Sequence, residues 1–404
     1  MGSLTIATQM LKIRGREVRP LVQGGMGVGI SAHRLAGAVA REACVGTISS
    51  VDLRRHHPDL MRETGRSRDK QAIERANLVA LDREIRAARE LAGGNGVIAV
   101  NVMRAVSQYA GYVRQACESG ADAIVVGAGL PFDLPELAAD YPGVALIPIL
   151  SEARAIGLVL RKWMRKGRLP DAIVIEHPRY AGGHLGAAKV DEVCDPRFDF
   201  AAVLPAAARL FEELRIAPIP LIVAGGINSP GRVREALALG AAGVQVGTPF
   251  AVTEESDAHP NFKRVLAEAR PEDIVTFMSV AGLPARAVRT PWLARYLDKE
   301  AVLQRRAKRR RECTLAFDCL AQCGLRDGNA RMGQFCIDHH LAAALHGDVD
   351  HGLFFRGSES VPFGGRIRPV RELTEHLLGA ASRQPDTGRA GALDIAGAGL
   401  PIRS

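Results

Sequence analysis

The sequence lacks long hydrophobic runs, and no apolar stretch reaches the ~20 residues that a membrane-spanning helix needs. It also lacks a basic N-terminal region followed by an apolar stretch, which is the pattern of a secretory signal. We therefore expect a cytoplasmic protein with no membrane partner. With 47% hydrophobic and 24% charged residues, the composition is typical of a globular chain.

Aromatic residues are scarce, at 5% of the chain, although the net charge is +9. Much of this charge lies in the run at residues 304–311, and no aromatic side chain is interleaved with it. Basic grooves that bind nucleic acid commonly add aromatic side chains on which the bases stack. We therefore interpret the run as a solvated helix face and expect no nucleic-acid partner.

Only seven of the 404 residues are cysteine, and without a secretory signal we expect no disulfide framework. Three are scattered, whereas the other four lie within 24 residues: Cys313, Cys319, Cys323 and Cys336. Their spacing lacks the x2 pairs of a zinc ribbon, but four thiolates can hold an iron–sulfur cluster of the 4Fe–4S type. Buried cysteines on amphipathic helices are the alternative interpretation.

Short apolar runs alternate with Ala- and Leu-rich helical stretches from residue 18 to about residue 290. The candidate strands are residues 18–25, 44–49, 96–101, 121–127, 145–149, 172–176, 220–225 and 242–247. Most runs are continuously apolar, as strands buried on both faces are, and strands that alternate with helices form parallel sheets. Eight such strands predict an α/β chain with a (β/α)8 TIM barrel. An open doubly wound sheet is the alternative.

The alternation stops near residue 290, and this divides the chain into three parts. We predict a barrel at residues 1–290 and an added, mainly helical C-terminal region at residues 291–382, which holds the cysteine cluster. Residues 383–404 are rich in Gly, Ala and Pro, and we expect a loosely ordered tail there.

Three glycines surround His184, directly after the candidate strand at residues 172–176. Glycine lets the backbone approach a flat ligand closely, and histidine is the side chain best suited to proton transfer near neutral pH. Barrels of this class keep their chemistry at the carboxyl ends of their strands. The pattern therefore predicts a ligand site at Gly182 and Gly183, with His184 as its proton-handling group.

Two glycine motifs end the last two candidate strands, Gly225–Gly226 and Gly247–Thr248. The loops after the seventh and eighth strands of such barrels often bind phosphate, because glycine exposes backbone N–H groups and a helix follows. Residues 23–26 end the first strand and Asn101 ends the third. Each is a candidate for contact with a ring system, although a tight turn or a loop-capping amide is an equal alternative when each is taken alone.

Together these motifs resemble the nitronate monooxygenase family, also called 2-nitropropane dioxygenases. Flavin-dependent enoyl-acyl-carrier-protein reductases share the same fold and similar motifs. The matching segments are residues 23–26, the strand that ends in Asn101, and residues 181–186, 224–227 and 243–248. They occur in the family's order between residues 18 and 290. Tyr180 stands where many relatives carry Glu.

The resemblance implies a TIM barrel that binds FMN without a covalent link. Gly225, Gly226, Gly247 and Thr248 would hold the phosphate, and His184 would face the flavin as the catalytic base. The residues along the rest of the cofactor would be Gln23, Gly24, Gly25, Met26, Asn101, Gly182, Gly183 and Gln245.

Three functions follow from this sequence. The first is oxidation of alkyl nitronates or nitroalkanes by O2, and the second is an NAD(P)H-dependent FMN reductase of enoyl thioesters or quinones, with or without an iron–sulfur cluster. A barrel that binds nucleotide or phosphate without catalysis is the third. In the first two functions, the partner is a small-molecule substrate. The sequence leaves open whether the chain forms a homodimer.

Overall fold

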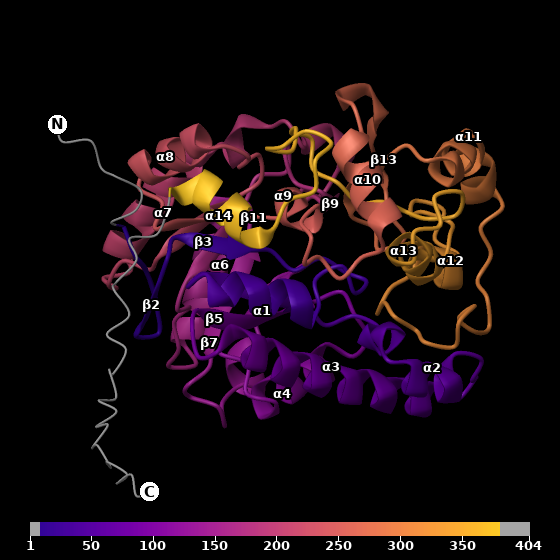
Figure 1. Cartoon of the computed structure of the whole chain (residues 1–404), viewed down its shortest axis with the longest axis horizontal. Helices are drawn as coiled ribbons and strands as arrows, with labels where there is room; N and C mark the ends of the chain where they lie inside the picture. The colour runs from indigo at the N-terminus through magenta and orange to yellow at the C-terminus, as the bar shows by residue number, and fades with distance from the viewer. Residues whose placement is uncertain (1–8, 380–404) are drawn as a thin grey trace, which may run out of the picture.

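In the computed structural model, which describes residues 9–379, eight parallel strands close into a barrel (Figure 1). The strands are β3 (Leu21–Gln23), β4 (Val45–Ser49), β5 (Val97–Met103), β6 (Ala123–Gly127), β7 (Ala145–Leu150), β8 (Ile173–Glu176), β10 (Leu221–Ala224) and β11 (Gly243–Val246). The last strand pairs with the first, with Val244 opposite Leu21. The predicted α/β fold, a (β/α)8 TIM barrel, is therefore confirmed.

Helices pack around this barrel in the order expected for the fold. They are α1 (His33–Arg41), α3 (Lys70–Ala92), α4 (Tyr109–Glu118), α5 (Leu134–Leu137), α6 (Ala153–Met164), α7 (Phe200–Glu213) and α8 (Pro230–Ala238). The main apolar core lies between them and the outward faces of the strands. Among residues 9–379, no helix is long and apolar enough to cross a membrane.

A hairpin closes the amino-terminal end of the barrel. Its strands are β1 (Leu11–Ile13) and β2 (Arg16–Val18), and their buried residues pack with the side chains that fill the barrel interior. The predicted first strand at residues 18–25 was therefore too long, because Val18 belongs to the hairpin and β3 covers only Leu21–Gln23. With this end plugged, the opposite end remains for a site.

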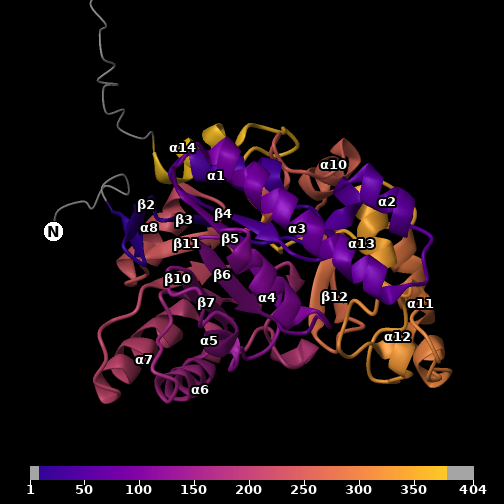
Figure 2. The same ribbon diagram turned by 90° about the horizontal axis from the view of Figure 1, so that it is seen from below.

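The carboxyl end of the barrel is covered by an added layer of strands and helices. A small antiparallel sheet joins β9 (Gly183–His184), β12 (Ile274–Met278) and β13 (Pro284–Val288). The helices of this layer are α2 (Pro58–Thr64), α9 (Thr248–Ala251), α10 (Pro260–Glu268), α11 (Pro291–Arg305), α12 (Gly324–Asp327) and α13 (Ile337–Leu345). Figure 2 shows α11, α12 and α13 together at one end of the molecule, beyond the barrel.

The last described helix, α14 (Val370–Leu378), returns to the barrel and packs against α1 and α8 (Figure 2). It thus stands where the eighth helix of the barrel belongs. The regular elements after residue 290 are helices, as predicted, but one of them completes the barrel. The boundaries at residues 290 and 382 stay predictions, and the tail at residues 383–404 lies outside the described residues.

Candidate active site

A cavity of about 280 Å³ opens at the carboxyl end of the barrel. Every barrel strand contributes a lining residue at or just after its end: Gly24, Ser49, Asn101, Gly127, Ile149, Glu176, Ala224 and Gln245. In a parallel barrel all carboxyl ends meet at one rim, so motifs far apart in the sequence converge there. The cavity is therefore built by the fold itself.

The residues predicted to form the flavin site converge on this cavity with one exception. Those that line it are His184, Gly24, Gly25, Met26, Asn101, Gly182, Gly183, Gly225, Gly226, Gln245, Gly247 and Thr248. The exception is Gln23, whose buried side chain bonds the backbone of Thr47 on the next strand, with Nε2 3.1 Å from its oxygen and Oε1 2.8 Å from its nitrogen. Gln23 therefore joins β3 to β4 rather than reaching a ligand.

Backbone N–H groups with no protein acceptor face one side of the cavity. Those of Gly226, Gly247 and Thr248 donate no hydrogen bond within the part of the chain that the structure describes. Thr248 Oγ1 accepts from the Gly357 N–H at 3.0 Å, which leaves its own hydroxyl proton free to donate. Three such N–H groups and a hydroxyl form a cradle that suits a phosphate.

Two glycines leave room beside this cradle. A Cβ on Gly247 would extend into the cavity, where its nearest neighbour is Met26 Sδ at 4.0 Å. Gly226 has a φ of +76°, which glycine adopts readily, and a Cβ there would lie 3.0 Å from Cγ of Tyr180. Tyr180 thus forms the wall beside the cradle.

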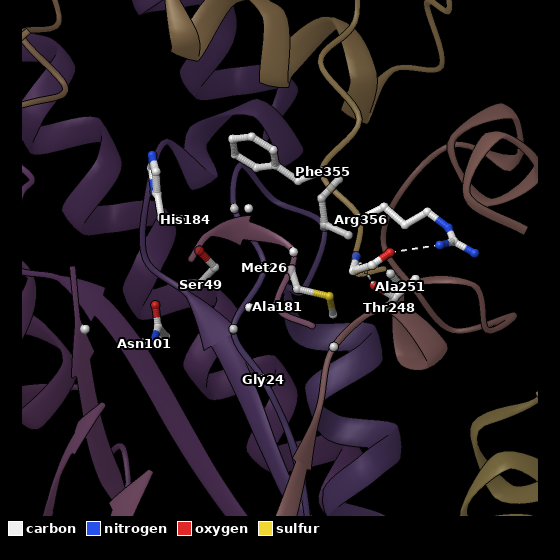
Figure 3. Close-up of a pocket in the computed structure, with 18 of the residues that line it drawn as sticks. Gly24, Met26, Ser49, Asn101, Ala181, His184, Thr248, Ala251, Phe355 and Arg356 are labelled. Carbon is white, nitrogen blue, oxygen red and sulfur yellow. Dashed lines mark hydrogen bonds between the residues drawn. The ribbon is translucent and has the colours of Figure 1, made fainter. Parts of the chain in front are cut away.

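The other side of the cavity brings a glycine loop against strand β5. A Cβ on Gly25 would lie 2.3 Å from Cβ of Asn101, so only glycine allows this approach. The Asn101 side chain makes no hydrogen bond within residues 9–379 and lines the cavity, as Figure 3 shows. Its amide is therefore free to donate to and accept from a bound ring edge.

His184 lies above the strand ends, next to Phe355 (Figure 3). Its strand β9 pairs with β13, and its Nε2 lies 3.1 Å from Ser279 Oγ. The ring centroids of His184 and Phe355 are 5.8 Å apart. Burial lowers the pKa of His184 to about 4, because the apolar surroundings disfavour the charged ring. The imidazole is therefore neutral at physiological pH and able to accept a proton.

A buried arginine holds the loop that carries His184. Arg286 on β13 donates from Nη1 to the carbonyl oxygens of Ala181 at 2.6 Å and Pro178 at 3.1 Å. Burial lowers the pKa of this guanidinium. Arg286 was not predictable from the sequence, because it lies about 100 residues after the motif that it supports and has no local signature.

Glu176 is a titratable residue of the cavity wall that sequence reasoning missed. It ends β8, and its carboxyl makes no hydrogen bond within the described part of the chain. Burial raises the pKa of Glu176 to about 7, so a large fraction of this acid is protonated at neutral pH. A charged residue at the end of an apolar run was the available signal.

The C-terminal region completes the cavity wall. Phe355, Arg356, Gly357 and Ser360 line it, and Gly182 packs directly on the backbone of Arg356, where a Cβ would lie 2.5 Å from the carbonyl carbon. The site therefore needs residues from beyond the predicted barrel boundary. No motif in this segment indicated it.

The predicted cysteine cluster lies beside the same cavity, since Cys319 lines it. All seven cysteines are free thiols. Within residues 9–379, no group of three or more His, Cys, Asp or Glu side chains is placed to hold a metal ion.

Over residues 8–379 the sequence matches the family described as nitronate monooxygenase. The chain belongs to the nitronate monooxygenase family. It is thus an FMN-dependent oxidoreductase, and the resemblance of its motifs is confirmed. The cradle of free N–H groups and the open amide of Asn101 fit the phosphate and the ring of FMN.

One curated relative and two solved structures are similar to this family member. A "Probable nitronate monooxygenase" of Bacillus subtilis (strain 168) is 27% identical over 290 residues, 68% of this chain and 78% of that protein. Two solved structures have similar folds. FabK from Thermotoga maritima has a TM-score of 0.61 at 23% identity, with 89% of this chain and 91% of that chain covered. A nitroalkane oxidase from Streptomyces ansochromogenes has a TM-score of 0.59 at 20% identity, with 90% and 96% covered.

Proposed function

We propose that this family member oxidises alkyl nitronates or nitroalkanes with O2, with His184 as the base. The observation that carries the proposal is a neutral histidine on the wall of a cavity whose other side is an anion cradle. FMN, when bound, would supply the redox chemistry between the substrate and O2.

The cofactor would lie between the two sides of the cavity. Its phosphate would accept from the N–H groups of Gly226, Gly247 and Thr248, beside Gly225. Its ring would lie along Gly24–Met26, within reach of the side-chain amides of Asn101 and Gln245. This arrangement leaves the His184 side of the cavity for the substrate.

His184 would take the proton of the substrate's α-carbon. The C–H beside a nitro group is acidic, and a neutral imidazole nitrogen accepts its proton as the nitronate forms. The resulting imidazolium then stabilises the adjacent anion, while the Ser279 hydroxyl at 3.1 Å orients the ring. A substrate supplied as the nitronate has already lost this proton and needs only to be bound.

Glu176 favours the second candidate, an NAD(P)H-dependent reductase of enoyl thioesters or quinones. Reduction of a C=C bond requires a proton as well as a hydride, and a carboxylic acid with a pKa of about 7 can donate one at neutral pH. The similarity to the FabK fold is compatible with this candidate.

Anaerobic mixing separates the two candidates. Wild-type protein carrying FMN is mixed without oxygen with a nitroalkane, with its nitronate, and separately with NADH and NADPH, and the flavin absorbance is followed. We expect reduction by the nitro compounds and reoxidation when O2 is admitted. Reduction by NADH or NADPH alone would reject the oxidase and support the reductase.

A further inference from the structure

One end of the cavity is lined by apolar side chains that the flavin contacts do not use. Phe355 marks its start, because its ring centroid lies 5.8 Å from that of His184. Leu320, Ile337, Leu341 and Leu353 line the cavity and pack in the same apolar cluster as Phe355. We call these four leucine and isoleucine side chains, together with Phe355, the apolar end. It lies on the His184 side of the cavity, and its side chains carry no polar atom.

The apolar end is held in place by polar contacts behind its side chains. The backbone of residues 319–321 is hydrogen-bonded to that of residues 105–107, at 3.3 and 2.9 Å, next to the pairing of Val106 with Leu320. Helix α13, which carries Leu341, is tied to the segment before α2 by Arg55, whose Nη2 lies 2.6 Å from Asp338 Oδ2. The wall is therefore formed before a ligand arrives, which lowers the entropy cost of binding.

This end of the cavity offers no cation to an acidic ligand. Its charged residue is Asp338, which is 2% exposed and already paired with Arg55. In the described part of the chain, Arg356 is the only Lys or Arg that lines the cavity. Its guanidinium donates to two backbone carbonyl oxygens, at 2.9 and 2.8 Å, and is directed away from His184 (Figure 3). A carboxylate placed here would be desolvated without a partner, which is costly.

We propose that the apolar end binds an uncharged alkyl chain of the substrate and that Leu341 determines how long this chain can be. The proposal rests on the proposed function, which places the substrate on the His184 side of the cavity. Leu320, Ile337 and Leu353 are 4%, 6% and 0% exposed, whereas Leu341 is only partly buried and keeps side-chain surface for a ligand. Each methylene that enters such a site should tighten binding about fourfold.

The test measures binding without turnover. Wild-type protein carrying FMN is titrated at neutral pH with butyramide, hexanamide and octanamide, which are uncharged and do not react, and the perturbation of the flavin absorbance is followed. We expect the affinity to rise about fourfold for each added methylene. Adipamate has the length of hexanamide but carries a carboxylate at its far end, and it should bind at least ~10-fold more weakly than hexanamide.

A matched pair of variants tests Leu341 itself. L341F narrows the apolar end and should weaken the binding of octanamide ~10-fold or more, with a smaller effect on butyramide. L158F makes the same change at a position on α6 that is 46% exposed and outside the cavity, and should bind octanamide as wild type does. Flavin content and circular dichroism show whether each variant is folded, and the wild-type series stands without them.

The outcomes separate this inference from the proposed function. Wild-type affinities that do not rise with chain length overturn the inference, as do equal affinities for hexanamide and adipamate. Equal octanamide affinity in L341F and L158F would remove Leu341 from its role. A flavin that nitroalkanes fail to reduce would reject the proposed oxidation, whereas the amide affinities would still show whether an alkyl chain binds at the apolar end.

Discussion

Arg286 gives a quantitative test of how the loop that carries His184 is held. R286M keeps most of the apolar stem and removes both hydrogen bonds, to Ala181 and Pro178. Hydrogen bonds from a charged donor contribute ~1.5–3 kcal/mol each. Removing a buried charge offsets part of this loss, so the net fall in the free energy of unfolding should be ~2–3 kcal/mol.

Urea denaturation at neutral pH, turnover and flavin content measure the effect together. Turnover in R286M should fall by ~10- to 100-fold, because misplacing a catalytic group by about 1 Å has effects of this size. R286K, which keeps the charge but loses the planar fork, should lie between R286M and wild type. R270M removes an exposed guanidinium and is the control. Unchanged stability and turnover in R286M would refute the anchoring role.

Three further predictions test the cavity. In H184N, flavin should stay bound while nitroalkane turnover falls by ~10²-fold or more. Burial raises the pKa of Glu176 to about 7, above the ~4.3 of a glutamate in an unfolded chain. Between these two pH values the folded state binds a proton that the unfolded state has lost, so the free energy of unfolding falls as pH rises. E176Q should remove this slope, at most ~4 kcal/mol, when urea unfolding is compared at acid and alkaline pH. G247A should weaken FMN binding at least ~10-fold in fluorescence titrations of the apoprotein, with little loss of stability. The control G231A, at an open helical position, should leave both the FMN affinity and the stability unchanged. Equal FMN affinity in G247A and G231A would mean that the phosphate lies elsewhere.

The barrel could be predicted because its signals are local. Each strand is a short apolar run followed by a helix, and eight such units leave few ways to pack. The hairpin of β1 and β2, the sheet of β9, β12 and β13, and the return of α14 were not predictable in this way. These elements take their places through contacts between residues far apart in the chain, which periodicity does not record.

The residues of the site also differ in whether the sequence could predict them. Glycine motifs at strand ends correctly placed His184 and the candidate phosphate-binding glycines at one cavity, because the backbone requirement is visible in one short stretch of sequence. The position of the Gln23 side chain was not predictable, since its motif says nothing of the hydrogen bonds that direct it to Thr47. Arg286 and Glu176 were missed because their roles come from burial and from distant partners.

The central claim is that a neutral His184 removes a proton from a substrate held against FMN. Its most direct test is anaerobic stopped-flow reduction of the flavin by a nitroalkane and by the matching preformed nitronate, in wild type and in H184N. We predict that H184N loses ~10²-fold or more in rate with the nitroalkane but reacts normally with the nitronate. In wild type, the rate of free enzyme with nitroalkane should fall only as pH drops toward about 4. Equal nitroalkane rates in the two proteins would contradict the claim.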